Sequence, residues 1–426
     1  MSIRAEIFNA LNKNYEYAVL RNYEELPDST STRDIDLIIR QEDYKRIERD
    51  VVKIVHTCRY YILLRFQSER FNTLIFGNAE SRDIVQLDFF FHTSARGIIM
   101  ITADELLNSR QFNGSVYHVS KKYQFLDKFL FNSAVGKSYP SKYGALKKWV
   151  EQDEETLSFL RERVRCNSIE DVEKLSAHEF RHRMLKYSFK YNKFVQVKNL
   201  LKFIYSNVHN FVFSQGFCIG ITGPDGVGKT TIMDSVKETL EKVVSGVTQF
   251  HFRPNIFDNL GDTMHIIGLN KEVDHDYSNP HRGKETSRIG SLGRLAYYTL
   301  DYIFGYLIKI KPLLYRRAIV IFDRYFTDVI VDAKRSKVNL GVKFLYAYSH
   351  LIPKLRYNIL LVADVEKIIS RKQELDRDSI EKIIDNMKMI SKKRGYYLLY
   401  NNSTPEVAVT EILDIVFTNQ DKRYRL

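Results

Sequence analysis

The sequence contains little cysteine and no long, uninterrupted apolar stretch. Its three cysteines, Cys58, Cys166 and Cys218, are scattered and lack the spacing of a metal site, which indicates that the thiols are kept reduced. No run approaches the roughly 18–20 apolar residues that span a bilayer. The N-terminal residues lack the apolar core of a signal peptide. We therefore expect a cytoplasmic protein without a membrane span.

Length and charge bear on the number of domains and on the kind of partner. The chain has 426 residues, which predicts two or three domains, and its hydrophobic content of 44% suffices for sizeable cores. It has 65 Lys and Arg residues against 52 Asp and Glu residues, a net charge of +13. This surplus favours anionic partners such as nucleotides, phosphosugars, nucleic acid or an anionic membrane surface, without choosing among them.

The pattern of apolar residues predicts three parts and an α/β fold. Residues 1–125 carry short strand-like runs and one clear helix, as expected for an α+β domain. Residues 126–210 have helical spacing and are predicted to be a helical connector. In residues 211–426 apolar strands alternate with helices, which indicates a parallel sheet covered on both faces. The helix in the first part is predicted from the spacing of Tyr44, Ile47, Val51 and Ile54.

A glycine-rich motif, "GPDGVGKT", follows the strand-like run "FCIGI" and precedes a predicted helix. It fits G-x-x-x-x-G-K-[ST], in which backbone N–H groups and a helix N-terminus bind phosphate. Lys229 is expected to reach the β- and γ-phosphates of ATP, and the hydroxyl of Thr230 to bind Mg²⁺. The predicted nucleotide-binding residues are Gly223, Asp225, Gly226, Gly228, Lys229, Thr230 and Thr231.

A second motif bears on what receives the phosphate. The strand-like run at residues 318–322 ends in Asp323, Arg324 and Tyr325, and parallel sheets bind ligands at the carboxyl ends of their strands. Asp323 is expected to orient the acceptor or the Mg²⁺ shell, and Arg324 to bind a phosphate through two nitrogens. A surface ion pair is the alternative for these residues. Together with the glycine-rich motif, however, they favour a kinase over a switch or motor ATPase, which presents only water to the phosphate.

Residues 214–420 resemble the thymidylate kinase family of P-loop kinases. The resemblance rests on the glycine-rich motif, on Arg253 in "FHFRPN", on "DRY" and on the lid-like segment "SRKQELDRDSIEK". It implies that Arg253, Arg324 and Tyr325 contact the acceptor. It also implies that the lid cations, Arg371, Lys372 and Arg377, stabilise the transferring charge. The predicted catalytic residues are therefore Lys229, Asp323, Arg324 and Arg371.

Two departures from the family pattern concern the acceptor. The Glu-Pro-Gly-Gly pattern is absent, and a long insertion at residues 270–298 lies where the acceptor nucleoside would sit. In this insertion His281, Arg282 and Lys284 would either bind an anionic acceptor or form a solvated loop. The segments "NPH" and "DRYFTD" are similar to those of thymidylate kinase-like proteins from bacterial surface-polysaccharide gene clusters, which suggests a role in that metabolism.

Three acidic residues in the first part suggest a different phosphate chemistry. Asp34 and Asp36 lie two apart on a predicted strand and so share one face, and Asp88 lies in another apolar strand. Converging carboxylates of this kind would hold one or two Mg²⁺ ions. The stretch "AVLRNYEELPDSTSTRDIDLIIR" resembles minimal nucleotidyltransferases. Their Gly-Ser turn is missing here, and Arg21 and Arg33 would replace it in part. An active enzyme and a degenerate regulatory or substrate-binding domain both stay open.

A basic, aromatic-rich run at residues 181–202 lies in the helical part. It would suit a nucleic-acid or membrane face. We favour an amphipathic helix that packs its Leu, Tyr and Phe side inward.

The sequence thus predicts an ATP- and Mg²⁺-dependent kinase with a small-molecule phosphate acceptor. The acceptor would be a nucleoside monophosphate such as dTMP or another small phosphorylated or hydroxylated compound. Nucleotidyltransferase activity on a sugar phosphate, protein or RNA is one alternative, and a nucleotide-gated nucleic-acid-binding protein is a less favoured one. The resemblance to thymidylate kinases adds a homodimer as an option.

Overall fold

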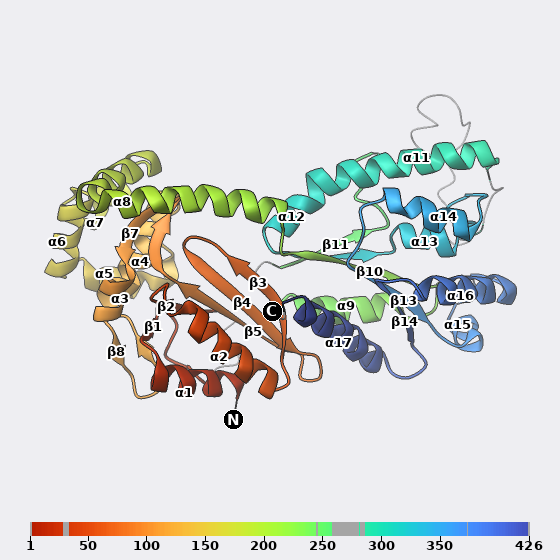
Figure 1. Ribbon diagram of the computed structural model, residues 1–426, viewed down its shortest axis with the longest axis horizontal. Coiled ribbons are helices and arrows are strands. Elements are labelled where there is room, and N and C mark those ends of the chain that lie inside the picture. Colours follow the sequence, from red (N-terminus) through yellow and green to blue (C-terminus); the bar gives the residue numbers. More distant parts are fainter. Residues whose placement is uncertain are drawn as a thin grey trace. The chain divides into compact units, whose positions relative to one another are not determined.

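The computed structural model describes residues 2–28, 34–243, 246–257, 281, 286–372 and 374–424. The chain divides into two compact units (Figure 1). The helical segment predicted as a connector lies within the first of them, and the division into three domains stays a prediction. The first unit comprises Met1–Asn78, Ile84–Val212 and Gln420–Leu426, and the second comprises Ala79–Asp83 and Phe213–Asn419.

The described part of the first unit contains a mixed sheet with the strand order β3-β4-β5-β2-β1-β9-β8. Strand β2 runs parallel to β5 and antiparallel to β1. A separate hairpin consists of β6 (His92–Ala95) and β7 (Ile98–Thr102). The strands of the sheet are β1 (Tyr17–Val19), β2 (Asp34–Ile39), β3 (Tyr61–Gln67), β4 (Phe71–Asn78), β5 (Asp83–Phe90), β8 (Gln111–Phe112) and β9 (Tyr117–His118).

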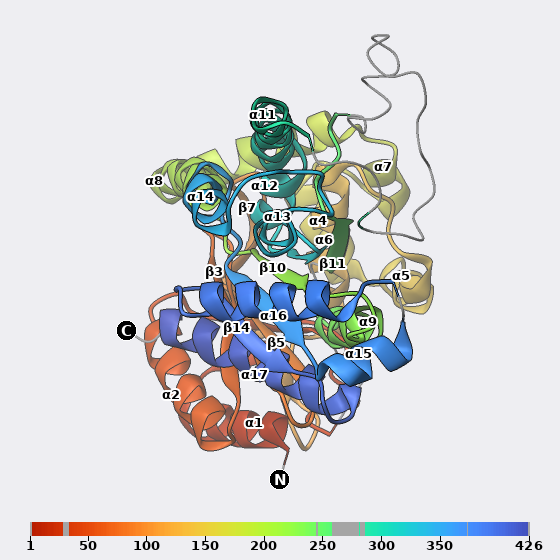
Figure 2. The same ribbon diagram turned by 90° about the vertical axis from the view of Figure 1, so that its right-hand side faces the viewer.

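Helices α1 (Ile3–Asn14) and α2 (Tyr44–Thr57) lie side by side and share a core with the sheet (Figures 1 and 2). Most of the predicted apolar face of α2 is buried, because residues three and four apart fall on one side of a helix. Ile54, the last residue of the predicted face, is only half-buried, and the adjacent Val55 is buried in its place.

The remaining helices of the first unit build a second core with the β6–β7 hairpin. In α8, Phe180 and Met184 pack into this core. Beyond Asn192 the expectation of an inward-facing Leu, Tyr and Phe side is wrong, because Phe194, Leu201 and Tyr205 are exposed and only Leu200 and Phe203 are half-buried. These helices are α3 (Ala103–Asn108), α4 (Lys121–Val135), the short 3₁₀ turn η1 (Ser141–Tyr143), α5 (Gly144–Val150), α6 (Glu154–Arg163), α7 (Ile169–Glu173) and α8 (Ala177–Val212).

The second unit is built on a parallel sheet, as the sequence predicts. The order β11-β12-β10-β13-β14 places every described strand parallel to its neighbours. The three inner strands are buried almost throughout, which explains their continuous apolar sequences. The strands are β10 (Phe217–Thr222), β11 (Val247–His251), β12 (Ile319–Asp323), β13 (Tyr357–Val362) and β14 (Tyr396–Tyr400).

Helices follow the strands of this sheet in alternation. None of the helices in the described ranges has the length and apolar content needed to cross a bilayer. The helical elements are α9 (Lys229–Leu240), α11 (Arg288–Gly305), the π-helical turn η2 (Tyr306–Ile310), α12 (Lys311–Tyr315), α13 (Phe326–Val331), α14 (Val342–Tyr348), the 3₁₀ turn η3 (Ser349–Leu351), α15 (Val365–Arg371), α16 (Arg377–Ser391) and α17 (Pro405–Tyr424).

Strand register brings the two predicted motifs together. Ile221 of β10 is paired with Asp323 of β12, so the residues after these strands leave the sheet side by side. Both motifs therefore lie at the carboxyl edge of the sheet, where ligands of such folds bind.

Candidate active site

The loop between β10 and α9 holds the glycine-rich motif. Helix α9 begins at Lys229, and the preceding glycines Gly226 and Gly228 have φ of +86° and +93°. Glycine adopts this left-handed region without steric cost. The first N–H groups of a helix lack helical partners, so they and the helix dipole favour an anion at this end. Thr230 and Thr231 are exposed in the first turn of α9.

The loop packs so closely on its surroundings that its glycines leave no room for a side chain. A Cβ at Gly223 would lie 2.5 Å from the carbonyl oxygen of Leu361. A Cβ at Gly226 would lie 2.8 Å from the carbonyl oxygen of Ile368. Real Cβ atoms do not approach backbone oxygen this closely, so the backbone path depends on glycine. A phosphate cradle of N–H groups fits this geometry.

Lys229 is buried beneath the loop. Its ammonium donates hydrogen bonds to the carbonyl oxygens of Gly223 and Pro224, both at 2.8 Å, and lies 3.6 Å from a carboxylate oxygen of Asp225. Burial lowers the pKa of Lys229 to about 8, and the positive charge of Arg324 contributes to the decrease. A phosphate at this position would restore the charged form.

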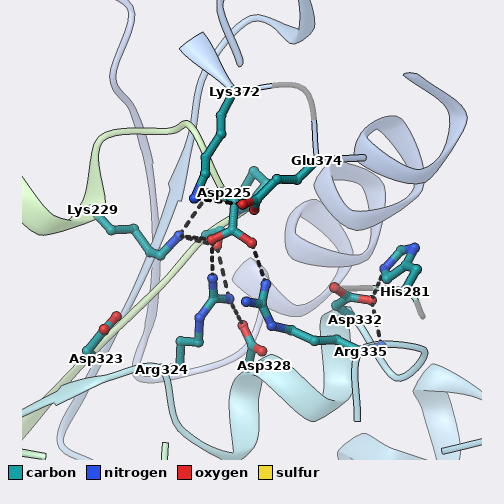
Figure 3. Close-up of polar contacts among 12 residues, drawn as sticks. Asp225, Lys229, His281, Asp323, Arg324, Asp328, Asp332, Arg335, Lys372 and Glu374 are labelled. Carbon is teal, nitrogen blue, oxygen red and sulfur yellow. Dashed lines mark hydrogen bonds and ion pairs between the residues drawn. The ribbon is translucent and has the colours of Figure 1, made fainter. Parts of the chain in front are cut away.

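Asp225 is the centre of the polar network. Figure 3 shows Lys229, Arg324 and Arg335 pointing toward its carboxylate. Arg324 donates to one oxygen at 2.6 Å and Arg335 to the other at 2.5 Å. Burial favours the protonated carboxyl, but the charges of Arg324, Lys229 and Arg335 outweigh it and hold the pKa of Asp225 below its ordinary value. The site therefore concentrates positive charge around one carboxylate.

Arg324 joins this network to α13. Arg324 is 5% exposed, and its guanidinium donates to Asp328 at 2.6 Å through the nitrogen that does not contact Asp225. Its backbone has a φ of +66°, the left-handed region, which costs a non-glycine residue on the order of 1–3 kcal/mol. Burial alone would lower the pKa of Arg324, but Asp328 and Asp225 raise it above its ordinary value. The guanidinium is therefore held charged and in a fixed orientation.

Asp323 lies at the end of β12, beside the network rather than within it. Its carboxylate pairs with the Nδ1 atom of His251 at 3.0 Å. Burial would raise the pKa of Asp323, but the hydrogen bond and charge of His251 outweigh this effect and lower it. Asp323 is thus ionised beside the cations of the loop, as expected of a group that orients an acceptor or a hydrated cation.

The predicted lid lies against the loop. A Cβ at Gly228 would lie 3.9 Å from a guanidinium nitrogen of Arg371, which ends α15. Lys372 pairs with Glu374 at 2.8 Å. Arg377 pairs with carboxylates on the exposed sides of α15 and α16 and takes no part in the network.

Two predicted acceptor-binding residues are buried and already have partners. Arg253 is 3% exposed, lies 3.4 Å from the carboxylate of Asp301 and has its guanidinium 5.0 Å from the ring centre of Tyr298. Tyr325 is 6% exposed and donates its hydroxyl to the carbonyl oxygen of Pro353 at 2.6 Å. The structure places both side chains in the core of the second unit, and their contacts with an acceptor stay predictions.

Three residues of the insertion were predicted to bind an anionic acceptor or to form a solvated loop, and the structure describes one of them, His281. His281 lies 2.8 Å from Asp332 through its Nε2 atom. Arg282 and Lys284 lie outside the described residues.

Sequence reasoning missed three residues of this site. Asp328 pairs with Arg324, but Arg324 precedes α13 and has a non-helical backbone, so the four-residue spacing does not by itself predict this ion pair. Asn401 donates to the carbonyl oxygen of Val227 at 2.8 Å, and its own side-chain oxygen is buried without a hydrogen-bond partner among the described residues. Neither Asn401 nor Arg335 belongs to a pattern from which its position could be predicted.

The lowered pKa of Lys229 leads to a testable expectation. In the free protein this ammonium loses its proton as the pH rises through about 8, whereas a bound phosphate would keep it charged. ATP binding above this pH must therefore take up a proton, and we expect the affinity to fall by up to about tenfold per pH unit. Calorimetric titration with Mg²⁺-ATP between pH 7 and 9.5 measures this effect. The variant Lys229→Met should lose this pH dependence of the ATP affinity. An unchanged pH dependence in that variant would contradict the assignment of Lys229 as the group that takes up the proton.

The first unit contains a separate group of carboxylates. Asp34 and Asp36 lie on β2, and the register of the parallel pair places Asp36 opposite Asp88 of β5. One carboxylate oxygen from each of the three lies within 4.8 Å of the others. The structure thus brings the three predicted metal ligands together, and their oxygen donors are of the kind that Mg²⁺ prefers.

Neighbouring side chains hold these carboxylates in place. Thr73 donates its hydroxyl to Asp88, and Gln86 donates to the other oxygen of Asp88 at 2.9 Å. Burial raises the pKa of Asp36 to about 6, and the negative charges of Asp88 and Asp34 add to this rise, although Arg21 opposes it. A divalent cation would relieve this repulsion.

Arg21 connects the carboxylates to a cavity. Its guanidinium pairs with Asp36 and with Asp127 of α4. A cavity of about 360 Å³ lies beside it, with cationic and aromatic side chains in its wall. Arg33, the other predicted substitute for the missing turn, lies outside the described residues. The lining includes Arg21, Lys121, Tyr139, Lys142, Tyr143 and Trp149.

Comparison with solved structures finds similarity to thymidylate kinases. The enzyme from Candida albicans is 18% identical, with a TM-score of 0.35, over 48% of this chain and 93% of the kinase. The enzyme from Ehrlichia chaffeensis is 17% identical, with a TM-score of 0.32, over 47% of this chain and 98% of the kinase. Scores this low do not identify the fold by themselves. No protein-family model and no curated protein matches this chain.

Proposed function

We propose that the second unit is an ATP- and Mg²⁺-dependent phosphotransferase that acts on a small phosphorylated acceptor. The observation that carries this proposal is the convergence of Lys229 and Arg324 on Asp225 at the mouth of the glycine loop. Such a loop binds a triphosphate, and the cations beyond it match charge that develops during phosphate transfer.

Each residue has a distinct part in this proposal. The N–H groups of the loop bind the phosphates, and Lys229 leaves the carbonyl oxygens of Gly223 and Pro224 to contact them. The exposed hydroxyl of Thr230 holds Mg²⁺, which when bound neutralises phosphate charge. Arg324 contacts the transferring or the acceptor phosphate through its planar guanidinium. Asp323 orients the acceptor oxygen, and Arg371 covers the site from α15.

The arginines indicate a charged acceptor. Arg324 and Arg335 come from the segment that follows β12, not from the glycine loop, and both are held by Asp225. An anionic acceptor would compete with Asp225 for these guanidinium groups, whereas a neutral one would gain nothing from them. We therefore favour a monophosphate such as dTMP over an acceptor that carries only hydroxyl groups. A role in surface-polysaccharide metabolism stays a prediction from the resemblance.

A panel of acceptors tests this proposal. The protein would be incubated with Mg²⁺-ATP and, in turn, nucleoside monophosphates, sugar phosphates and the corresponding unphosphorylated compounds. We expect ADP release that depends on a phosphorylated acceptor. Release that is the same with and without acceptors would indicate an ATPase and would contradict the proposal.

The convergence of Asp34, Asp36 and Asp88 supports a second candidate function, nucleotidyl transfer by the first unit. The three carboxylates would hold Mg²⁺, which when bound activates the attacking group and neutralises the α-phosphate. Arg21 and the cations of the adjacent cavity would bind the remaining phosphates. The acceptor would be a sugar phosphate, a protein or RNA.

Replacement of Asp36 by asparagine tests the second candidate. Loss of a metal ligand should lower pyrophosphate release by at least roughly 10–100-fold, because loss of a side chain that only orients a metal ligand already has an effect of this size. Pyrophosphate release from ATP would be compared with that of Asp104→Asn, which changes an exposed carboxylate outside the cluster. Equal loss in both variants, or none in Asp36→Asn, would contradict a role for the cluster.

A further inference from the structure

The second half of α8 begins at a break in the helix. Asn192 has a φ of −152° and a ψ of 68°, which are not helical, and its side-chain oxygen accepts a hydrogen bond from the N–H of Val195 at 3.4 Å. Asn192 therefore acts as the N-cap of a separate helical segment, residues 193–212. This segment is the C-terminal half of the yellow-green helix α8 in Figure 1.

One side of this segment, which includes Gln196 and Asn199, packs on the β6–β7 hairpin of the same unit. Gln196 donates to the carbonyl oxygen of Gly97 at 2.8 Å and accepts from the N–H of Ile99 at 3.1 Å. Asn199 donates to the same carbonyl oxygen at 2.9 Å. A Cβ at Gly97 would lie 3.0 Å from the Cβ of Phe203, so the helix approaches the β6–β7 turn as closely as glycine permits. The orientation of the segment is therefore fixed by buried hydrogen bonds.

The opposite side of the segment is apolar and exposed. Its exposed fractions run from 39% at Val197 to 87% at Phe194. Soluble proteins rarely expose contiguous apolar patches beyond about 300–600 Å², and larger ones mark interaction sites. The helix is thus inverted relative to an ordinary surface helix, which buries its apolar side. The large exposed residues of this side are Phe194, Val197, Leu201, Ile204, Val208 and Phe211.

The spacing of these residues indicates another helix as the occupant. The intervals between them alternate between three and four residues over the whole segment. This is the a and d pattern of a coiled-coil seam, in which side chains of one helix insert between those of another. In the same heptads Gln196, Asn199 and Phe203 occupy c and f positions, opposite the seam, so the seam points away from the β6–β7 hairpin.

The flanking charges favour pairing of two copies in antiparallel orientation. Lys193 and Lys198 occupy g and e positions. In a parallel pair of identical helices these lysines would face each other, which is unfavourable. In an antiparallel pair Phe194 meets Phe211 of the second copy, and Lys198 faces Tyr205 of the second copy, a favourable cation–π arrangement.

The exposed side chains supply a substantial part of the area that a dimer needs. Aromatic side chains bury about 150–250 Å² each when fully covered, and the seam has Phe194, 87% exposed, at one end and Phe211, 52% exposed, at the other. With the four aliphatic residues between them, which are 39–63% exposed, the seam contributes on the order of several hundred Å² toward the roughly 800 Å² per partner that stable interfaces bury. We propose that the protein forms a homodimer in which residues 193–212 of two copies pair as an antiparallel coiled coil. This proposal does not depend on the catalytic assignment.

Mass measurement in solution tests the proposal. Sedimentation equilibrium of the full chain should give twice the monomer mass of 50.2 kDa. Leu201→Glu places two unpaired charges near the centre of the seam and should weaken the dimer by roughly 100-fold or more. The matched control is Val195→Glu, which introduces the same charge at an exposed b position, 48% exposed, outside the seam. A monomeric wild-type protein, or a dimer that Leu201→Glu leaves intact, would overturn the proposal.

Cysteine cross-linking determines orientation and remains informative if Leu201→Glu does not fold. Phe194→Cys and Phe211→Cys would be prepared separately in a Cys58→Ser background, because Cys58 is the native cysteine that is not buried. On oxidation, an antiparallel seam predicts disulfides only in the mixture of both variants. A disulfide in each variant alone would indicate a parallel seam, and none in any sample would indicate that α8 is not the interface. Both results would overturn the proposal.

A membrane surface is the main competing occupant. Flotation with vesicles containing phosphatidylserine, at protein concentrations above the dimer range, distinguishes the two. We expect the wild-type protein to remain unbound. Vesicle binding that Leu201→Glu abolishes, with a monomeric mass for the wild type, would replace the homodimer by membrane association.

Discussion

Replacement of Lys229 by alanine is expected to abolish ATP-dependent phosphate transfer. Loss of one preorganised charge-stabilising donor costs about 10²–10³ in rate, and Lys229 is the only predicted lysine contact within the glycine loop. Its ammonium is already positioned by the carbonyl oxygens of Gly223 and Pro224, directly beneath the loop. The rate of acceptor-dependent ADP formation measures the effect.

The fold should survive this change. Lys229 is buried and lies in a charged network with Asp225, so thermal unfolding must be measured beside the activity. Lys242→Ala is a suitable control, because the ammonium of Lys242 donates to the carbonyl oxygen of Arg82, outside the site. Turnover at the wild-type rate in a folded Lys229→Ala protein would contradict the assignment of the loop.

Replacement of Arg324 by lysine is expected to lower transfer by about 10²-fold, although the charge is kept. The guanidinium contacts Asp225 through one nitrogen and Asp328 through another, and a single ammonium does not span both carboxylates. The buried carboxylate that loses its partner should also destabilise the protein by a few kcal/mol, since unpaired buried charges are costly. Steady-state kinetics and thermal unfolding measure the two effects separately.

Arg377→Lys provides the matched control for this substitution. Arg377 pairs with exposed carboxylates of α15 and α16, and such surface pairs contribute little. We expect wild-type kinetics and stability. If Arg324→Lys behaved like Arg377→Lys, the network around Asp225 would have no role in transfer.

Local sequence patterns were sufficient to predict where the glycine loop, Asp323 and the pair Asp34 and Asp36 lie in the fold. The glycine loop is a contiguous motif, and its glycines adopt the left-handed backbone that their position before α9 requires. Continuous apolar runs indicated the buried parallel strands, and the order of motif and strand placed Asp323 at the ligand edge. The two-residue spacing of Asp34 and Asp36 similarly predicted a shared face.

Contacts between segments that are distant in the sequence could not be predicted from these local patterns. Asp225 was predicted to bind nucleotide, but the sequence does not show that it also holds Arg335, which lies 110 residues further along the chain. Likewise, the pairing of Arg253 with Asp301 depends on where α11 packs. In α8 the apolar pattern was recognised correctly, but its direction was not, because buried hydrogen bonds to the turn at Gly97 orient the helix.

Separation of the nucleotide products by mass distinguishes the two units most directly. Wild-type protein, Lys229→Ala and Asp36→Asn would each be incubated with Mg²⁺-ATP, dTMP and a panel of other phosphorylated acceptors. We predict acceptor-dependent ADP that Lys229→Ala loses and Asp36→Asn retains. Pyrophosphate with transfer of AMP, lost in Asp36→Asn and retained in Lys229→Ala, would contradict phosphate transfer by the second unit and would assign the chemistry to the carboxylates of the first.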